Sequence, residues 1–306
     1  MSFQDATVIP VNGEGTEDVL VDDRGRIYTG LADGRIVRID NDGATIETVA
    51  TSPGRPLGLE FYGDDELAVC ASDHGLLAVS LTSGEVRVLA DTAFDAPIIA
   101  CNNAAVAEDG TIYFSDSSRR YPIPEWRTDL IEQTRTGRLL RRNTDGTVDE
   151  LLTGLHFANG VALAPDESFV TVAESGACRV CRLWLTGPRA GTSDMFLDDL
   201  SGYPDNSSTG SDGLIWVAIP APKNPALDVV QRLPGLVRSA VTKLPESLQP
   251  APSNTVRVVG VDDRGDVVRS YQGEIEGFHM LTGVRERDDR LYFGSLHESA
   301  VVTMSR

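Results

Sequence analysis

Hydrophobic and polar residues alternate along most of the chain, in short runs separated by acidic turns that often contain glycine. A period of two is that of a half-buried β-strand, and helical periodicity is scarce. Six segments repeat the pattern of strand, tight acidic turn and strand: VLVDDRGRIYTG (19–30), LEFYGDDELAVC (59–70), AAVAEDGTIYFSD (104–116), VALAPDESFVTVA (161–173), SSTGSDGLIWVA (207–218) and GVRERDDRLYFGS (283–295). Weak self-similarity at intervals of roughly 40–50 residues is typical of propellers, in which each blade is a four-stranded sheet. The pattern therefore predicts an all-β fold, a six-bladed β-propeller.

The two ends of the chain indicate how the propeller closes. The last blade has only the 25 residues from 282 to 306, so it lacks a strand. The N-terminal stretch FQDATVIPV (3–11) is a free strand that would complete this blade and remove an open sheet edge. We therefore expect residues 1–306 to form one domain.

Two intervals between blades are longer than the others, and they mark insertions at residues 119–135 and 222–250. In the second insertion, apolar residues recur at helical spacing: Leu227, Val230, Leu233, Val237, Val241 and Leu244. One interpretation is a helix packed on the propeller. The other is a short helical lid over the mouth of the channel, because long insertions in compact domains often line sites. A membrane anchor is disfavoured, because the polar face is not richly basic.

The six turns also share a register. They align on their second residue: Gly25, Asp65, Gly110, Glu167, Gly213 and Asp289. Eight residues before the first five, and seven before the sixth, stand Glu17, Leu57, Asn102, Asn159, Asp205 and Thr282. These residues begin the innermost strand of each blade, and such strand starts converge on one end of the central channel. One polar residue at a strand start is ordinary turn chemistry, but four of six in register indicate a shared role.

The four oxygen-bearing residues of this register, Glu17, Asn102, Asn159 and Asp205, are predicted to bind a metal ion. Two carboxylates and two amide oxygens form a hard site with a formal charge of −2, without thiolate or imidazole in register. Such a site disfavours zinc and favours Ca²⁺, which takes about six to eight oxygen ligands and tolerates irregular geometry. A cation also removes the cost of crowding two carboxylates. Asn206, beside Asp205, would lend another oxygen.

The composition of the chain limits the binding partners and the cellular location that we expect for the protein. The 306-residue chain has a formal net charge of −19 and a pI of about 4.5, which repels phosphate backbones, so we expect no nucleic-acid partner. No apolar run is long enough to span a bilayer, and the N-terminus lacks the features of a signal peptide. We therefore expect no membrane partner, a cytoplasmic location and a small-molecule substrate.

The four cysteines, Cys70, Cys101, Cys178 and Cys181, are interpreted as structural. The segment CRVC (178–181) has the spacing of a metal-binding pair, but it lies within a strand-like run. Residues three apart on a strand point to opposite faces, so this pair cannot easily share a metal ion.

Among the four histidines, His279 is the candidate for acid–base chemistry, because it lies three residues before Thr282 and so near the channel mouth. Asp116 and Glu174 stand near strand ends, where we interpret both carboxylates as structural.

Longer stretches resemble a known family. The segment FANGVALAPDESFVTVAESGACRVCRLWLTGPRAGTSDMFLDDLSGYPDN (157–206) is similar to the strictosidine synthase-like family, as are RLPGLVRSAVTKLPESLQP (232–250) and LYFGSL (291–296). That family lies within the superfamily of gluconolactonase, regucalcin, paraoxonase and diisopropyl fluorophosphatase. The resemblance implies a six-bladed propeller with Ca²⁺ in its channel. It also implies Glu17, Asn102, Asn159 and Asp205 as ligands, with Asn206 added as in paraoxonases.

The chain departs from this resemblance at two register positions. Plant strictosidine synthase has a catalytic glutamate at the start of its sixth inner strand, where this chain has Thr282. Paraoxonases have a histidine at the start of the second blade, where this chain has Leu57. Both the condensation chemistry and the histidine dyad of those enzymes are therefore disfavoured.

The leading hypothesis from the sequence is a Ca²⁺-dependent hydrolase of a lactone or ester, in which the ion polarises the carbonyl group and Asp205 acts as nucleophile or base. The expected site consists of Asp205 and His279 as catalytic residues and Asn206, Thr282, Leu57 and Trp126 as substrate-binding residues. Two alternatives stay open: a condensing enzyme of the strictosidine synthase type, and a non-catalytic propeller that binds a partner around a structural Ca²⁺.

Overall fold

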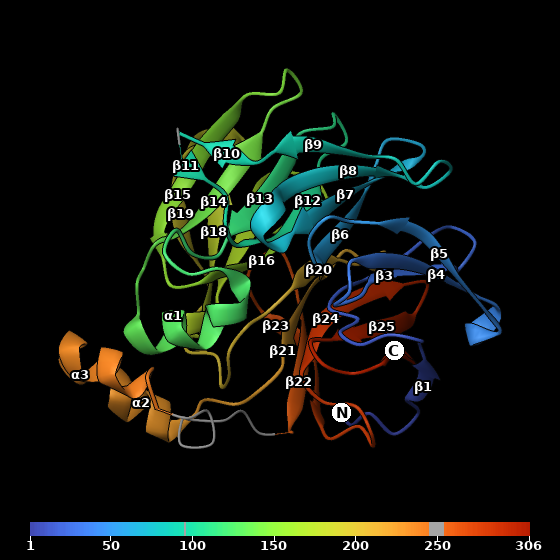
Figure 1. Ribbon diagram of the computed structural model, residues 1–306. Coiled ribbons are helices and arrows are strands. Elements are labelled where there is room, and N and C mark those ends of the chain that lie inside the picture. The colour runs from blue at the N-terminus through green and yellow to red at the C-terminus, as the bar shows by residue number, and fades with distance from the viewer. Residues whose placement is uncertain (95, 245–253) are drawn as a thin grey trace.

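Six four-stranded antiparallel sheets surround a central axis in the computed structural model, which describes residues 1–94, 96–244 and 254–306 (Figure 1). The predicted six-bladed propeller is confirmed. In five blades the strands follow the chain from the innermost to the outermost. The first blade consists of β2 Val19–Val21, β3 Ile27–Gly30, β4 Arg35–Asp40 and β5 Thr45–Thr51, and the second of β6 Pro56–Tyr62, β7 Glu66–Ala71, β8 Gly75–Ser80 and β9 Val86–Ala90. The third consists of β12 Cys101–Val106, β13 Ile112–Asp116, β14 Gly137–Arg142 and β15 Val148–Leu155, and the fourth of β16 Ala158–Leu163, β17 Phe169–Glu174, β18 Arg179–Trp184 and β19 Ser193–Leu197. The fifth consists of β20 Ser207–Thr209, β21 Ile215–Ile219, β22 Val256–Val261 and β23 Val267–Gly273.

The sixth blade joins the two ends of the chain. Its strands are β24 Leu281–Arg287, β25 Arg290–Ser295, β26 Ala300–Ser305 and, on the outside, β1 Thr7–Pro10. Strand β1 lies within the segment 3–11 and pairs with β26, with Ile9 opposite Val301. The side chain of Ile9 is buried in the core, whereas its neighbour Val8 is 38% exposed. This alternation explains why such a short strand binds to the sheet edge in one register.

A small hairpin, β10 Thr92–Ala93 with β11 Ala96–Pro97, precedes the third blade, and 3₁₀ turns occur at Asn41–Gly43, Ser72–His74, Ile123–Glu125, Ser175–Ala177 and Gly187–Arg189. The α-helices are α1 Trp126–Glu132, α2 Pro225–Gln231 and α3 Gly235–Val241. All three come from the predicted insertions, and they pack against one another at one end of the molecule (Figure 1). None of the helices that the structure describes is long and apolar enough to cross a membrane.

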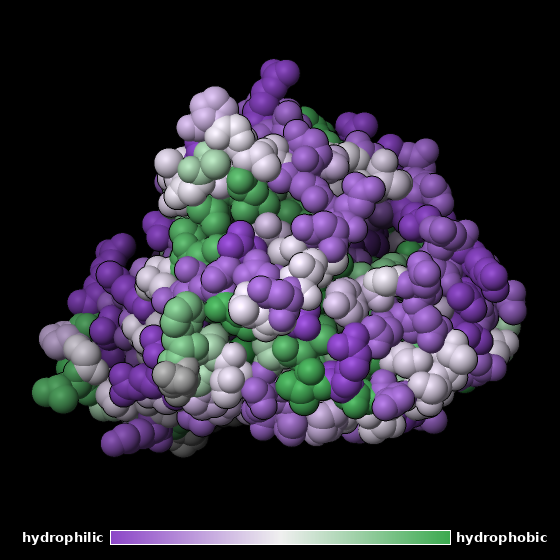
Figure 2. Space-filling view, turned by 90° about the horizontal axis from the view of Figure 1, so that it is seen from above, coloured by the Kyte–Doolittle hydropathy of each residue, from purple (hydrophilic) through white to green (hydrophobic). Residues whose placement is uncertain are grey.

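Proline divides the helical segment of the second insertion. Asn224 caps α2 by accepting hydrogen bonds from the backbone of Ala226 and Leu227, and Pro234 ends this helical run before α3 begins. The prediction of one packed apolar face is therefore only partly right, since Leu227 is buried but Leu233 and Val237 are 37% and 44% exposed. An apolar projection is visible at the edge of the molecule where Figure 1 places α3 (Figure 2). Residues 245–250 of this insertion lie outside the described residues.

Adjacent blades approach closely around the channel because glycine follows the register positions. A Cβ atom at Gly160 would lie 2.3 Å from the carbonyl oxygen of Asp205, and one at Gly283 would lie 2.8 Å from the Cα atom of Asp18. Any larger side chain would push the inner strands of neighbouring blades apart. The close approach brings the strand starts, and hence the register residues, within reach of one another.

Candidate metal centre and its pocket

The structure places all six register residues at the starts of the innermost strands. Leu57, Asn102, Asn159 and Thr282 are the second residues of β6, β12, β16 and β24, and Glu17 and Asp205 come two residues before β2 and β20. Four of the six side chains, those of Glu17, Asn102, Asn159 and Asp205, line one cavity of about 100 Å³. We call these four residues the floor.

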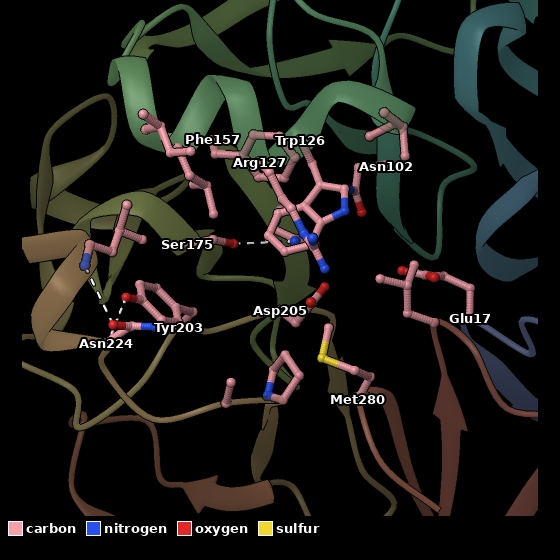
Figure 3. Close-up of a pocket in the computed structure, with 18 residues that line it drawn as sticks. Glu17, Asn102, Trp126, Arg127, Phe157, Ser175, Tyr203, Asp205, Asn224 and Met280 are labelled. Carbon is pink, nitrogen blue, oxygen red and sulfur yellow. Dashed lines mark hydrogen bonds between the residues drawn. The ribbon is translucent and has the colours of Figure 1, made fainter. Parts of the chain in front are cut away.

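The insertions supply half of the other residues that line the cavity. Trp126 and Arg127 point from α1 into the pocket, toward the floor residues (Figure 3). We call the contribution of the insertions the roof, which consists of Ile123, Trp126, Arg127, Leu130, Ile131, Asn224 and Leu227. Between floor and roof, the walls are Phe157, Ser175, Tyr203, Pro220, Ala221, Met280 and Leu296. A polar floor thus faces a largely apolar roof, which is the usual make-up of a small-molecule site.

Two serines fix the orientation of the floor amides. Ser117 Oγ donates a hydrogen bond to the carbonyl oxygen of Ala158 at 2.6 Å, so it can only accept from the amide nitrogen of Asn102, 3.0 Å away. Ser175 does the same for Asn159, at 3.2 Å, while donating to Pro204. The amide oxygens of Asn102 and Asn159 are buried and have no hydrogen-bond partner among the described residues. Because the nitrogens are tied to the serines, these two oxygens are the atoms left for the cavity.

The two floor carboxylates lie in an unfavourable environment. Glu17 is 4% exposed, and burial raises the pKa of its carboxyl group, although the Arg55 guanidinium opposes this. One nitrogen of Arg55 lies 3.2 Å from Glu17 Oε2 and 2.8 Å from the carbonyl oxygen of Leu296. Burial and the proximity of Glu17 raise the pKa of Asp205 well above its ordinary value. Two such carboxylates beside each other favour either a proton or a cation between them.

These donors fit a calcium ion. Two carboxylates and two amide oxygens without partners form an all-oxygen set, and Ca²⁺ is the common biological cation that such a set suits. The two amides are needed for this fit. Among the described residues, no group of three or more histidine, cysteine, aspartate or glutamate side chains could hold a metal ion. Asn206 adds a further candidate, since it is 1% exposed and neither atom of its side-chain amide has a described partner.

The structure brings only part of the expected substrate site together. Trp126 lines the cavity, whereas Asn206, Thr282 and Leu57 are each about 1% exposed and lie outside its lining. Thr282 Oγ1 donates to the carbonyl oxygen of Glu17 at 2.8 Å, and Leu57 packs in a cluster below α1. Of these three side chains, only that of Thr282 is hydrogen-bonded to a floor residue among the described contacts.

The expected catalytic pair is also separated. Asp205 lies on the floor, but the His279 side chain is 46% exposed and is not among the residues that line the cavity. Its Nδ1 atom forms an ion pair with Glu298 instead. The next residue, Met280, has a left-handed backbone and turns its own side chain into the pocket, so His279 faces away from it.

Several residues near the floor were missed by sequence reasoning, namely Ser117, Ser175, Arg55, Arg127 and Tyr203. The serines carried a signal, because each follows an acid at the end of the second strand of its blade, in DS (116–117) and ES (174–175). Tyr203 carried no such signal in the sequence. In the structure its hydroxyl oxygen accepts a hydrogen bond from the backbone of Asn224 at 3.0 Å, and burial raises the pKa of the hydroxyl to about 12.

The two acids before these serines are structural, as expected. Asp116 pairs with the buried Arg138, at 2.7 Å between Oδ2 and Nη2, and accepts a bond from the backbone of Ala100. Glu174 pairs with Arg179 at 2.7 Å and accepts bonds from the backbone of His156 and from the Cys181 thiol. Both acids anchor the loops that lead into the floor strands β12 and β16. The four cysteines are all free and buried.

Comparison with known proteins found matching family models and similar relatives. The family model for strictosidine synthase matches residues 102–188, and the model for the N-terminal region of strictosidine synthase-like proteins matches residues 3–39. Strictosidine synthase-like protein 10 of Arabidopsis thaliana is 31% identical, with 96% of this chain and 86% of that protein covered. Strictosidine synthase-like protein 13 of the same plant is 35% identical, with 76% of this chain but only 64% of that protein covered. The chain thus spans less than two thirds of the length of that relative.

Solved structures share the fold at low sequence identity. A gluconolactonase from Xanthomonas campestris superposes with a TM-score of 0.71 at 14% identity, covering 98% of this chain and 89% of that one. A calcium-binding protein, regucalcin, from Agrobacterium tumefaciens superposes with a TM-score of 0.66 at 16% identity, covering 97% and 94%. These likenesses show a common propeller architecture.

Proposed function

The chain belongs to the strictosidine synthase-like family, and we propose that it is a calcium-dependent hydrolase of a lactone or an ester. The observation that carries this proposal is the floor itself. Two amide oxygens without a hydrogen-bond partner in the described part of the chain meet two carboxylates with raised pKa values at the bottom of a pocket. The names of two structural neighbours, a gluconolactonase and a calcium-binding regucalcin, support the same chemistry.

Glu17, Asn102, Asn159 and Asp205 would hold the ion. When bound, Ca²⁺ would supply Lewis-acid polarisation of the substrate carbonyl and would stabilise negative charge on its oxygen. Amides accept no proton near neutral pH, so the base must be a carboxylate. Glu17 is almost fully buried and bonded to Arg55, whereas Asp205 is only partly buried and faces the cavity. In this proposal Asp205 would therefore take a proton from water, or attack the carbonyl directly.

The roof contributes binding and the exclusion of water. Trp126, Leu130 and Leu227 offer apolar surface opposite the floor, so the non-reacting part of a substrate would pack there. The reacting carbonyl would then be directed at the floor, and closure of the site by α1 and α2 would keep bulk water away from it.

The alternative function, a condensing enzyme of the strictosidine synthase type, has less support, because of the residue that begins the innermost strand of the sixth blade. Thr282 has no ionisable group, its hydroxyl is committed to the carbonyl oxygen of Glu17, and it is 1% exposed. An acid–base residue for amine condensation is therefore missing at the position where plant strictosidine synthase has its glutamate.

A panel of lactones and aryl esters, assayed with calcium and again after chelation, tests the proposal. We expect turnover of at least one class of substrate, lost on chelation and restored by Ca²⁺ but not by Zn²⁺. Absence of hydrolysis across the panel, in a protein that still binds calcium, would instead favour a binding propeller with a structural ion.

A further inference from the structure

A continuous series of hydrogen bonds runs behind the floor, from one candidate ligand to the next. Asn102 donates to Ser117, and Ser117 donates to the carbonyl of Ala158, the residue before Asn159. Asn159 donates to Ser175, which donates to the carbonyl of Pro204, the residue before Asp205. The same device thus occurs in two successive blades, each time joining a ligand side chain to the backbone of the next ligand.

The series continues through the last blade to the first. The backbone nitrogen of Asn206, next to Asp205, donates to the carbonyl oxygen of Thr282 at 3.2 Å. The hydroxyl of Thr282 then donates to the carbonyl oxygen of Glu17 at 2.8 Å. The second blade provides Arg55, which bonds the carboxylate of Glu17 from the other side. Residues of the second to the sixth blade therefore take part in this series, including the second and the sixth, whose register residue is not a candidate ligand.

We propose that Ser117, Ser175 and Thr282 are positioning residues that form a hydrogen-bonded girdle around the calcium site. This inference rests on the proposed function, because it concerns the affinity of the same site for the ion. The three side chains are between 0% and 5% exposed, so solvent cannot readily replace their hydrogen bonds.

The physical basis is the orientation of the floor amides. An asparagine side chain can turn over, and then it presents a nitrogen carrying two hydrogens where an oxygen is needed. Each serine prevents this, because its own proton is committed to a carbonyl and only its lone pair faces the amide. Loss of such an outer contact commonly weakens metal binding by about 10- to 100-fold.

The girdle also predicts coupling between positions. Ser117 holds the backbone in front of Asn159, and Ser175 holds the side chain of that same residue. The variant with both serines substituted should therefore lose less calcium affinity than the product of the two single fold-losses, because either change already displaces Asn159. Two serines with independent roles would give multiplicative effects.

Calorimetric titration of chelator-treated protein with Ca²⁺ tests the inference. We expect about one site in the parent, and an affinity lower by about 10- to 100-fold in Ser117→Ala and in Ser175→Ala. Ser115→Ala is the matched control, because this buried serine, two residues before Ser117, bonds the backbone of Asn103 instead of a floor residue. Thr282→Val should weaken binding, and Thr282→Ser, which keeps the hydroxyl, should restore it. Melting temperatures measured in chelator report any loss of folding separately.

The outcomes separate the girdle from the function on which it rests. Calcium binding by the parent that is unchanged in the serine variants, or lowered equally by Ser115→Ala, would overturn the girdle and leave the hydrolase proposal intact. A parent that binds no calcium would overturn both.

Discussion

The floor of the cavity is assembled from the starts of the propeller's innermost strands, whereas its roof comes from two insertions between blades. Floor residues are polar, three of the four are almost fully buried, and they are joined by hydrogen bonds from blade to blade. The roof is largely apolar, and its helices are short, at seven residues each. We infer a division of labour, in which the repeated architecture holds the ion and the irregular segments select the substrate. Disturbing one region should then leave the other intact.

The largest expected effect comes from opening the ring of blades, since every floor position depends on closure. Deleting residues 1–11 removes β1 and exposes an edge of the sixth sheet, so we expect aggregation or loss of the folded monomer. Size-exclusion chromatography and thermal melting measure this. Val8→Asp, an exposed position in the same strand, is the control and should leave the monomer intact. A truncated protein that stays monomeric, folded and able to bind calcium would show that the floor does not need closure.

Within the floor, the charge of Asp205 should matter more to turnover than to calcium binding. Asp205→Asn keeps the shape and one oxygen donor but removes the base, so we expect turnover of the best substrate to fall by at least roughly a hundredfold. Calcium affinity should fall less than in Glu17→Ala. Asp199→Asn, an exposed site in the same loop region, should behave as the parent. Near-parental turnover in Asp205→Asn would reduce Asp205 to a ligand and direct attention to His279.

In the roof, Trp126→Ala should lower kcat/KM by roughly tenfold, mainly by raising KM, because it removes apolar contact with the non-reacting part of the substrate. Calcium affinity should not change, since Trp126 does not contact the floor through any of the described hydrogen bonds. Trp184→Ala, an aromatic truncation in the fourth blade at a residue that does not line this cavity, is the matched control. If Trp126→Ala also weakened calcium binding, floor and roof would not be separable.

The smallest effect concerns stability and pH in the absence of calcium. Because the pKa of Asp205 is raised by burial and by Glu17, the folded state holds its proton more tightly than the unfolded state does. Chelator-treated protein should therefore lose stability as pH rises from about 4, the ordinary carboxyl value, through the raised pKa. We expect its melting temperature to fall by a few degrees between about pH 5 and about pH 8. Asp205→Asn or saturating Ca²⁺ should reduce this dependence, to which the raised pKa values of Glu17 and Asp18 also contribute, and a slope unchanged by either would contradict the crowding of two carboxylates.

The sequence by itself determined the fold and the floor. Six alternating segments with acidic turns are sufficient for six blades, because the side-chain period of a strand and the chemistry of tight turns are local properties. The register of Glu17, Asn102, Asn159 and Asp205 followed from the same repeat, since equivalent positions of equivalent blades occupy equivalent places around an axis. The family resemblance selected the same four residues.

Only the tertiary structure decided which residues reach the cavity from outside that repeat. The insertions have no equivalent in other blades, so their register could not be carried over, and Pro234 interrupted the helical period that the spacing suggested. His279 and Met280 are adjacent in sequence, yet a left-handed backbone at Met280 turns one into the pocket and leaves the other outside it. The bonds of Ser117 and Ser175 reach residues 41 and 29 positions further along the chain, in the next blade, and such contacts are fixed by how closely the blades pack. Local pattern specifies each strand, but the partner of a buried polar atom depends on which neighbour the packing brings within hydrogen-bond distance.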